Sequence, residues 1–159
     1  MRTGAAATIA VAALVLAAPP ALARANPQPM AAGAYTTQVL SQDVFRESNG
    51  VGFVKEVDMD TYIGGLVGAA TDTYTFSFVL ANGSGAGHGT EVCNSCTIGG
   101  RTGGYTAVFN FRVPAGGGNF TGTETFIHGT GGLAGLRGGG SFQGNGAVNT
   151  YSYTYHFEP

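Results

Sequence analysis

Hydrophobic and polar residues alternate along most of the chain from residue 35 onward. In the segment 72–80, aromatic and aliphatic side chains occupy every second position from Tyr74 to Leu80, and threonine or serine occupies positions 73, 75 and 77. The segments 105–113 and 150–157 alternate in the same way. Because successive side chains of a strand point to opposite faces, this period of two predicts half-buried β-strands. Weaker alternation predicts further strands at 35–46, 52–62, 89–98, 120–128 and 139–143.

Short segments rich in glycine and asparagine separate these predicted strands, at 48–50, 82–85, 99–100, 115–119 and 143–146. After residue 25, no segment repeats its apolar residues with the 3.6-residue period of a helix. About eight short strands joined by such turns are typical of an antiparallel sandwich or barrel. No linker or change of composition divides the segment 35–159, which we therefore interpret as one all-β domain.

The first 25 residues have the features of an export signal. Arg2 supplies a positive charge, residues 5–18 are apolar, and small residues suited to cleavage occupy positions 21, 23 and 25. The apolar run is shorter than the ~18 residues needed to cross a bilayer. We therefore expect a signal peptide over 1–25, a flexible leader over 26–34, and a secreted or extracytoplasmic mature protein without a membrane span.

The charge of the chain argues against nucleic acid as a partner. The sequence has seven lysine and arginine residues and nine acidic residues, a formal net charge of -2. Removal of residues 1–25 would take away Arg2 and Arg24 and make the balance more acidic. No basic patch remains that could follow a phosphate backbone.

Cys93 and Cys96 are the two cysteines of the chain. Their spacing occurs in redox-active motifs, but those need a helix N-terminus to activate the first thiol, and this pair lies between strand-like segments. A zinc site could combine both sulfurs with His88 and Glu91, although the spacing matches known zinc sites weakly. We expect a structural disulfide, as is usual in exported proteins, and no bound metal.

The segment 128–140, HGTGGLAGLRGGG, contains a match to the G-x-G-x-x-A pattern of nucleotide-binding loops. That mechanism needs a helix directly after the loop, and the three glycines at 138–140 disfavour one. A flexible linker is also a poor interpretation, because Leu133, Leu136 and Arg137 are large side chains within the run. The remaining interpretation is a turn in which the backbone goes where side chains would clash.

The same segment resembles a known family. Residues 129–142, GTGGLAGLRGGGSF, resemble the GTG-x-L-A-G-L-R-G-x-G-x-F signature of an uncharacterised bacterial domain family, which is similar to the allene oxide cyclase and dirigent barrels of plants. The segments 99–105 and 151–157 resemble further parts of that family, so the resemblance covers about 89–157. It implies a single small antiparallel β-barrel of about eight strands. In such a barrel the structural turn would consist of Gly129, Gly131, Gly135, Arg137 and Gly138.

Glu56, Asp58 and Asp60 alternate along one face of a predicted strand. Carboxylates can bind calcium, but the spacing and the glycine of an EF-hand loop are absent here. We expect these three residues on a solvated outer face of the domain.

Glu124 shares one predicted strand face with Phe126 and His128. If this face points into a barrel, Glu124 becomes a buried candidate acid or base; if it points outward, Glu124 is an ordinary surface group. The pattern does not decide between the two, and the outward orientation is our expectation. Arg112, on another strand, raises the same question.

The aromatic strand faces could line a lumen or fill it. We expect the protein to bind a small apolar molecule in the lumen, without a cofactor. The family resemblance implies two alternatives: an isomerase or cyclase with Glu124 and Arg112 as catalytic candidates, and a dirigent-like scaffold that orients reactive partners. A solid-core structural protein is a further alternative, and the oligomeric state stays open, with a homo-oligomer among the outcomes. The expected ligand-binding residues are Tyr74, Phe76, Phe78, Tyr105, Phe109, Phe111, Tyr151, Tyr153 and Tyr155.

Overall fold

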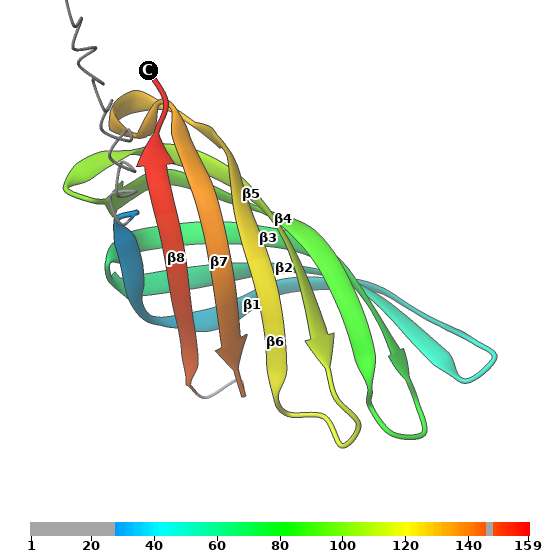
Figure 1. Cartoon of the computed structure of the whole chain (residues 1–159). Helices are drawn as coiled ribbons and strands as arrows, with labels where there is room; N and C mark the ends of the chain where they lie inside the picture. Colours follow the sequence, from blue (N-terminus) through cyan, green and yellow to red (C-terminus); the bar gives the residue numbers. More distant parts are fainter. Residues whose placement is uncertain (1–27, 146–147) are drawn as a thin grey trace, which may run out of the picture.

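Eight antiparallel strands form a closed barrel in the computed structural model, which describes residues 28–145 and 148–159 (Figure 1). Each strand pairs with the next along the chain, and β8 pairs back with β1. The predicted all-β barrel is therefore confirmed, whereas the predicted signal peptide lies outside the described residues. The strands are β1 (Met30–Ser48), β2 (Val51–Gly64), β3 (Leu66–Val79), β4 (Gly85–Ile98), β5 (Arg101–Val113), β6 (Phe120–Gly129), β7 (Leu136–Gly144) and β8 (Asn149–Phe157).

The predicted strands fall within the observed ones, except that the segment 72–80 extends one residue beyond the end of β3, and the main difference is at the first strand. β1 begins at Met30, so residues 30–34, expected to belong to a loose leader, pair with β8. A single 3-10 turn, η1 (Gly131–Leu133), precedes β7. No helix within the described ranges is long and apolar enough to cross a membrane.

The barrel closes along only part of its height. β1 pairs with β8 from Met30 to Tyr35, opposite Thr154 to Asn149. Beyond Tyr35, the described part of the chain gives β1 pairing with β2 alone. The side chains of Thr37 and Val39 are consequently exposed, Val39 to 56%. The interior of the barrel can therefore be reached from this side, which we call the open side.

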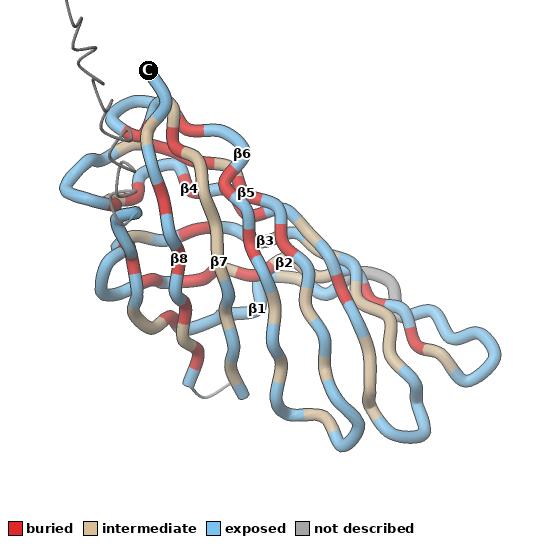
Figure 2. The backbone as a smooth tube through the Cα atoms, in the orientation of Figure 1, coloured by how far each residue is buried: buried red, intermediate tan, exposed pale blue. Residues whose placement is uncertain are grey.

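The opposite end of the barrel is packed solid. Leu66, Ile98, Leu133 and Leu136 are fully buried there, together with Phe126. Figure 2 shows buried and exposed positions alternating along the strands, with the hairpins at the lower end largely exposed. Burying such side chains contributes about 1.5–3 kcal/mol each. This packed end fixes the strands whose other halves surround the lumen.

The glycine-rich segment forms the closure of the packed end, with backbone passing close to backbone. A side chain at Gly129 would place its Cβ 1.9 Å from the carbonyl oxygen of Leu133. Gly135 has a φ of 76° and accepts a hydrogen bond of 2.8 Å from the Glu158 amide. Arg137 donates to the Leu136 carbonyl at 2.9 Å and lies 3.0 Å from a carboxylate oxygen of Glu158. The segment is thus a tight barrel turn and not a phosphate loop.

Candidate functional site

Six acidic side chains converge in the interior of the barrel, and we call them the lumenal carboxylate cluster. They come from four strands: three from β2 and one each from β3, β4 and β6. Two-thirds of the nine acidic residues of the sequence therefore point away from bulk solvent. The cluster consists of Glu56, Asp58, Asp60, Asp72, Glu91 and Glu124.

The outer position expected for Glu56, Asp58 and Asp60 is wrong. Asp58 and Asp60 are each only 4% exposed, and all three line the lumen. Their strand face also carries Val54 and Tyr62, which are buried, so the apolar ends of β2 determine which face turns inward. The carboxylates between them are turned inward with the rest of the strand.

The outward orientation expected for Glu124 is also wrong, because this residue is 3% exposed and faces the lumen. In the β-sheet register it lies opposite Phe109 of β5 and Gly140 of β7. His128, expected on the same face, is exposed. A register shift between β5 and β6 at Thr106 breaks the alternation after Phe126 and turns His128 outward.

Arg112 lies outside the lumen. Its side chain is exposed and lines a separate hollow of about 600 Å³ at the hairpin end of the barrel, beside Val113 and Pro114. It therefore cannot act together with Glu124 on a molecule held inside the barrel, as the predicted pair of catalytic candidates would require.

Tyrosine hydroxyls donate hydrogen bonds to several members of the cluster. Tyr62 donates to Glu91 Oε2 at 2.6 Å, and Tyr105 donates to Glu91 Oε1. Tyr153 donates to Glu124 Oε2 at 2.5 Å. Hydroxyl donors stabilise a carboxylate but add no positive charge, so they do not neutralise the negative charge of the cluster.

Nearer the open side, Tyr74 bridges two members of the cluster. Its hydroxyl lies 3.0 Å from Glu56 Oε1 and 2.9 Å from Asp58 Oδ2. Gln42 of β1 donates to the other oxygen of Glu56 at 2.9 Å. Glu56 and Asp58 therefore form an outer pair whose geometry Tyr74 sets.

Several buried carboxylate oxygens have no hydrogen-bond partner among the described residues. They are Oδ1 of Asp58, Asp60 and Asp72 and Oε1 of Glu124. Every lysine and histidine whose burial the structure describes is exposed, as is every such arginine except the half-buried Arg137, which pairs with Glu158. An unpaired charge in such a place is costly, so the groups either keep their protons or take up a cation.

Burial raises the pKa of these carboxyls. The pKa of Asp58 rises to about 6 and that of Asp60 to about 7, chiefly because the charged form loses its hydration. Burial and the neighbouring Glu91 raise the pKa of Asp72 to about 11. The pKa of Glu124 is also well above its ordinary value, from burial first and then from Glu91. Asp72 therefore keeps its proton at neutral pH, and burial favours the protonated form of Glu124 as well.

A cavity of about 240 Å³ adjoins the cluster. Its walls combine the carboxylates with aromatic rings, and Phe109 packs edge-on against Phe142 with 6.1 Å between ring centroids. Tyr74 and Phe111 meet in the same way at 5.5 Å. Besides the six acidic residues, the cavity is lined by Tyr35, Thr37, Val39, Tyr62, Tyr74, Phe109, Phe111, Phe120, Phe142 and Asn149.

The nine aromatic residues expected to bind a ligand divide into three groups. Tyr74, Phe109 and Phe111 line the cavity. Phe76 and Phe78 are half-buried and line an adjoining hollow nearer the hairpins. The remaining four are buried residues of the packed end: Tyr105, Tyr151, Tyr153 and Tyr155.

Sequence reasoning missed Tyr35, Phe120, Phe142 and Asn149, which also line the cavity. Tyr35 and Phe142 continue the alternation of strands that were predicted, which was the available signal. Asn149 is the first residue of β8 and lies one position before the predicted segment 150–157. Only the pairing with β1 places it opposite Tyr35.

Cys93 and Cys96 are joined as a disulfide on β4, so the expected pairing is supported. Both are buried, and they flank a register shift between β4 and β5. Because the two sulfurs are bonded to each other, the structure supports neither the zinc site with His88 nor a redox-active dithiol. His88 is exposed and lies within 3.4 Å of the Thr75 hydroxyl.

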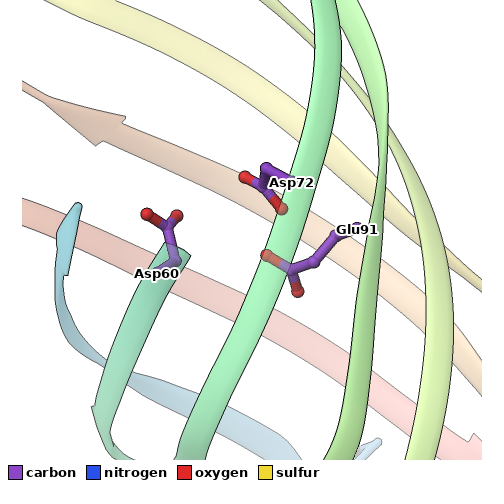
Figure 3. Close-up of side chains that lie close together, drawn as sticks. All are labelled: Asp60, Asp72 and Glu91. Carbon is purple, nitrogen blue, oxygen red and sulfur yellow. The ribbon is translucent and has the colours of Figure 1, made fainter. Parts of the chain in front are cut away.

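Three members of the cluster lie especially close together. Asp60, Asp72 and Glu91 each offer a carboxylate oxygen, and these oxygens lie within 4.8 Å of one another. Figure 3 shows the three side chains reaching from neighbouring strands into one shared space. We call them the inner triad.

Comparisons with known proteins identify the fold and not the activity. No protein-family model matches the chain, and no curated protein matches it either. One solved structure, a protein of unknown function from the DUF3224 family of Shewanella oneidensis, superposes with a TM-score of 0.71. It is 17% identical in sequence, and the match covers 83% of this chain and 98% of that one. The chain is therefore similar to that protein in its barrel fold.

Proposed function

We propose that this protein binds a small molecule in the lumen of its barrel. The observation that carries the proposal is the cavity of about 240 Å³, which has phenylalanine rings on one side and buried, partly unpaired carboxylates on the other. Sites for small molecules combine apolar walls with a few polar groups in this way. The volume is below the ~300–1,000 Å³ typical of drug-sized ligands, which favours a compact molecule.

The lining modifies the chemistry expected of the ligand. A wholly apolar molecule would leave Glu56 and Asp58 facing it without compensation. A molecule with an aromatic or aliphatic body and a protonated amine would pack its body against Phe109 and Phe111. Its amine would meet the carboxylates and the face of Tyr74, which also attracts cations.

A matched set of probes tests this proposal. Phenethylamine, 2-phenylethanol and 3-phenylpropionate share a phenyl ring and differ in the charge of the polar end. We expect saturable binding of the amine by calorimetry, at least tenfold tighter than the alcohol, and no binding of the acid. Native mass spectrometry of the purified protein would in addition detect co-purified molecules.

Two variants and one control locate the binding site. Phe111→Ala and Glu56→Gln should each weaken amine binding, because they change the cavity wall. Phe53→Ala is the matched control, since Phe53 is 42% exposed and is not among the lining residues of this cavity. Equal affinity for all three probes, or binding that Phe111→Ala leaves unchanged, would contradict the proposal.

Glu124 favours a second candidate function, an isomerase or cyclase of the allene oxide cyclase type. Its buried carboxyl lines the cavity, and burial raises its pKa well above the ordinary value, which favours the protonated form that could deliver a proton to a bound substrate. A neighbouring carboxylate would then remove a proton from another carbon of the protonated substrate, so that the isomer forms with no net change in protons. Incubation with apolar metabolite extracts in D₂O tests this: the native protein should add deuterium to a substrate, and Glu124→Gln should not. A dirigent-like scaffold would bind the same molecules without exchange.

Export to an oxidising compartment belongs to the same proposal. The apolar segment 5–18 with its flanking residues supports it, and so does a buried disulfide, which is rare in reducing compartments.

A further inference from the structure

We propose that Asp60, Asp72 and Glu91 bind a divalent cation of the oxygen-preferring class, calcium in the first place. Calcium binds carboxylate oxygens at 2.3–2.6 Å, so two ligands on opposite sides of one ion lie about 5 Å apart. The oxygens of the inner triad lie within 4.8 Å of one another. One ion between them would therefore reach all three carboxylates without moving a strand.

An unsatisfied buried oxygen points to the same ligand. Asp60 is 4% exposed, and within the described part of the chain its Oδ1 accepts no hydrogen bond. Oδ1 of Asp72 is likewise buried and unpaired there. The three side chains point into a common space (Figure 3). A cation in that space would give these two aspartates a partner, whereas hydroxyl donors of the barrel wall already contact Glu91.

The choice of donor atoms restricts the class of metal. All three ligands are carboxylates, which suit calcium, magnesium and manganese better than zinc or copper. Thiolate ligands are not available, because both cysteines form the disulfide. His88, His128 and His156 are exposed on the outside of the barrel.

The surroundings of Glu91 hold it in position for such an ion. Tyr62 and Tyr105 donate to its two oxygens from β2 and β5 and fix the orientation of the carboxylate. Groups that hold a ligand in this way are typical of metal sites. The adjoining cavity of about 240 Å³ has room for the waters that complete a coordination shell of six to eight oxygens.

This inference does not rest on the proposed function, because amine binding depends on the outer pair and the aromatic wall. Cation binding without amine binding would support the metal site and contradict only the proposed function. Amine binding without cation binding would overturn the metal site and leave the proposed function in place. The two are measured on the same protein in separate titrations.

Terbium luminescence tests the site directly. The chain contains seven tyrosines and no tryptophan, and Tyr62 and Tyr35 line the same cavity as the triad. We expect excitation of tyrosine to sensitise one equivalent of Tb³⁺, and calcium to displace it. Calorimetry with calcium alone, on protein treated first with a chelator, provides the second measurement.

The variants Asp60→Asn and Asp72→Asn should each weaken both signals at least tenfold. Glu47→Gln is the matched control, because Glu47 is an exposed acidic residue of β1. If one variant fails to fold by circular dichroism, the other variant and the native titration still decide. The proposal is overturned if native protein shows neither saturable terbium luminescence nor heat with calcium, or if folded Asp60→Asn binds as tightly as the native chain.

Discussion

Tyr153 of β8 donates a hydrogen bond to Glu124 of β6 across Gly140 of β7. Gly140 lies opposite Glu124 on one side and opposite Tyr153 on the other, so the two side chains meet over a position that has none. Gly140 belongs to the glycine-rich segment that closes the packed end. That segment therefore also determines the geometry of the lumen.

Replacing Tyr153 by Phe should destabilise the protein by about 1–3 kcal/mol, because a buried carboxyl loses its donor and stays buried. Urea denaturation measures the change in the free energy of unfolding. The double variant with Glu124→Gln should cost less than the two single variants added together, since both remove the same hydrogen bond. Additive costs would show that the bond contributes nothing to stability.

Introducing a side chain at Gly140 should be costly in a different way. A Cβ there would lie 2.0 Å from the carbonyl oxygen of Ser152, so Gly140→Ala requires the backbone to move. We expect a loss of about 1–3 kcal/mol in thermal or urea unfolding. Gly100→Asn is the control, because a Cβ at Gly100 meets nothing within 4 Å and asparagine tolerates positive φ. Similar losses in both variants would argue against the close approach of β7 and β8.

The stability of the metal-free protein should fall as the pH rises from 5 to 8. The folded-state pKa values of Asp58 and Asp60, about 6 and about 7, lie above the ordinary value near 4. The folded state therefore binds more protons than the unfolded state in this range. The stabilisation is complete below about pH 4 and is lost as the pH rises through the raised values.

The groups facing the two aspartates are acidic or neutral: Glu56, Asp72, Glu91, Thr37 and Tyr74. We expect Asp58 and Asp60 together to contribute a loss on the order of 3 kcal/mol between pH 5 and pH 8, and Asp72, whose pKa is also raised, to add to it. Urea denaturation in the presence of a chelator measures it, and Asp58→Asn with Asp60→Asn should reduce the slope. A stability that is constant or rises over this interval would contradict the raised pKa values.

The native protein should resist alkylation and have a mass two hydrogens below that of the reduced chain, because Cys93 and Cys96 form a disulfide. The bond closes a very short loop, with a separation of three residues. Replacing both cysteines by alanine should therefore cost only about 2 kcal/mol of unfolding free energy. Two alkylatable thiols in freshly isolated native protein would refute the pairing.

Exported protein should begin at Asn26. Expression of the full chain with its own N-terminus, followed by intact mass measurement of the extracytoplasmic fraction, gives the site of cleavage. Replacing Ala23 and Ala25 by Leu should block processing, because the cleavage site needs small residues. An uncleaved chain in the cytoplasm as the sole product would contradict export.

The alternation of apolar and polar residues was enough to predict the strands. The predicted segments 72–80, 105–113 and 150–157 overlap β3, β5 and β8, because a period of two is a property of the extended backbone itself. The turns and the disulfide likewise followed from local sequence. These features depend on neighbours along the chain, which a sequence displays directly.

Which face of a strand turns inward was decided only by the tertiary structure. Alternation places Glu56, Asp58 and Asp60 on one face, and closure of the barrel, which buries Val54 and Tyr62, makes that face the inner one. The register shift beside Thr106 separates His128 from Glu124 in the same manner. The lumenal cluster draws carboxylates from four strands, and only pairing between strands brings such distant positions together. The sequence alone therefore determined the elements, while closure and register determined the site, because both depend on contacts between residues far apart in the chain.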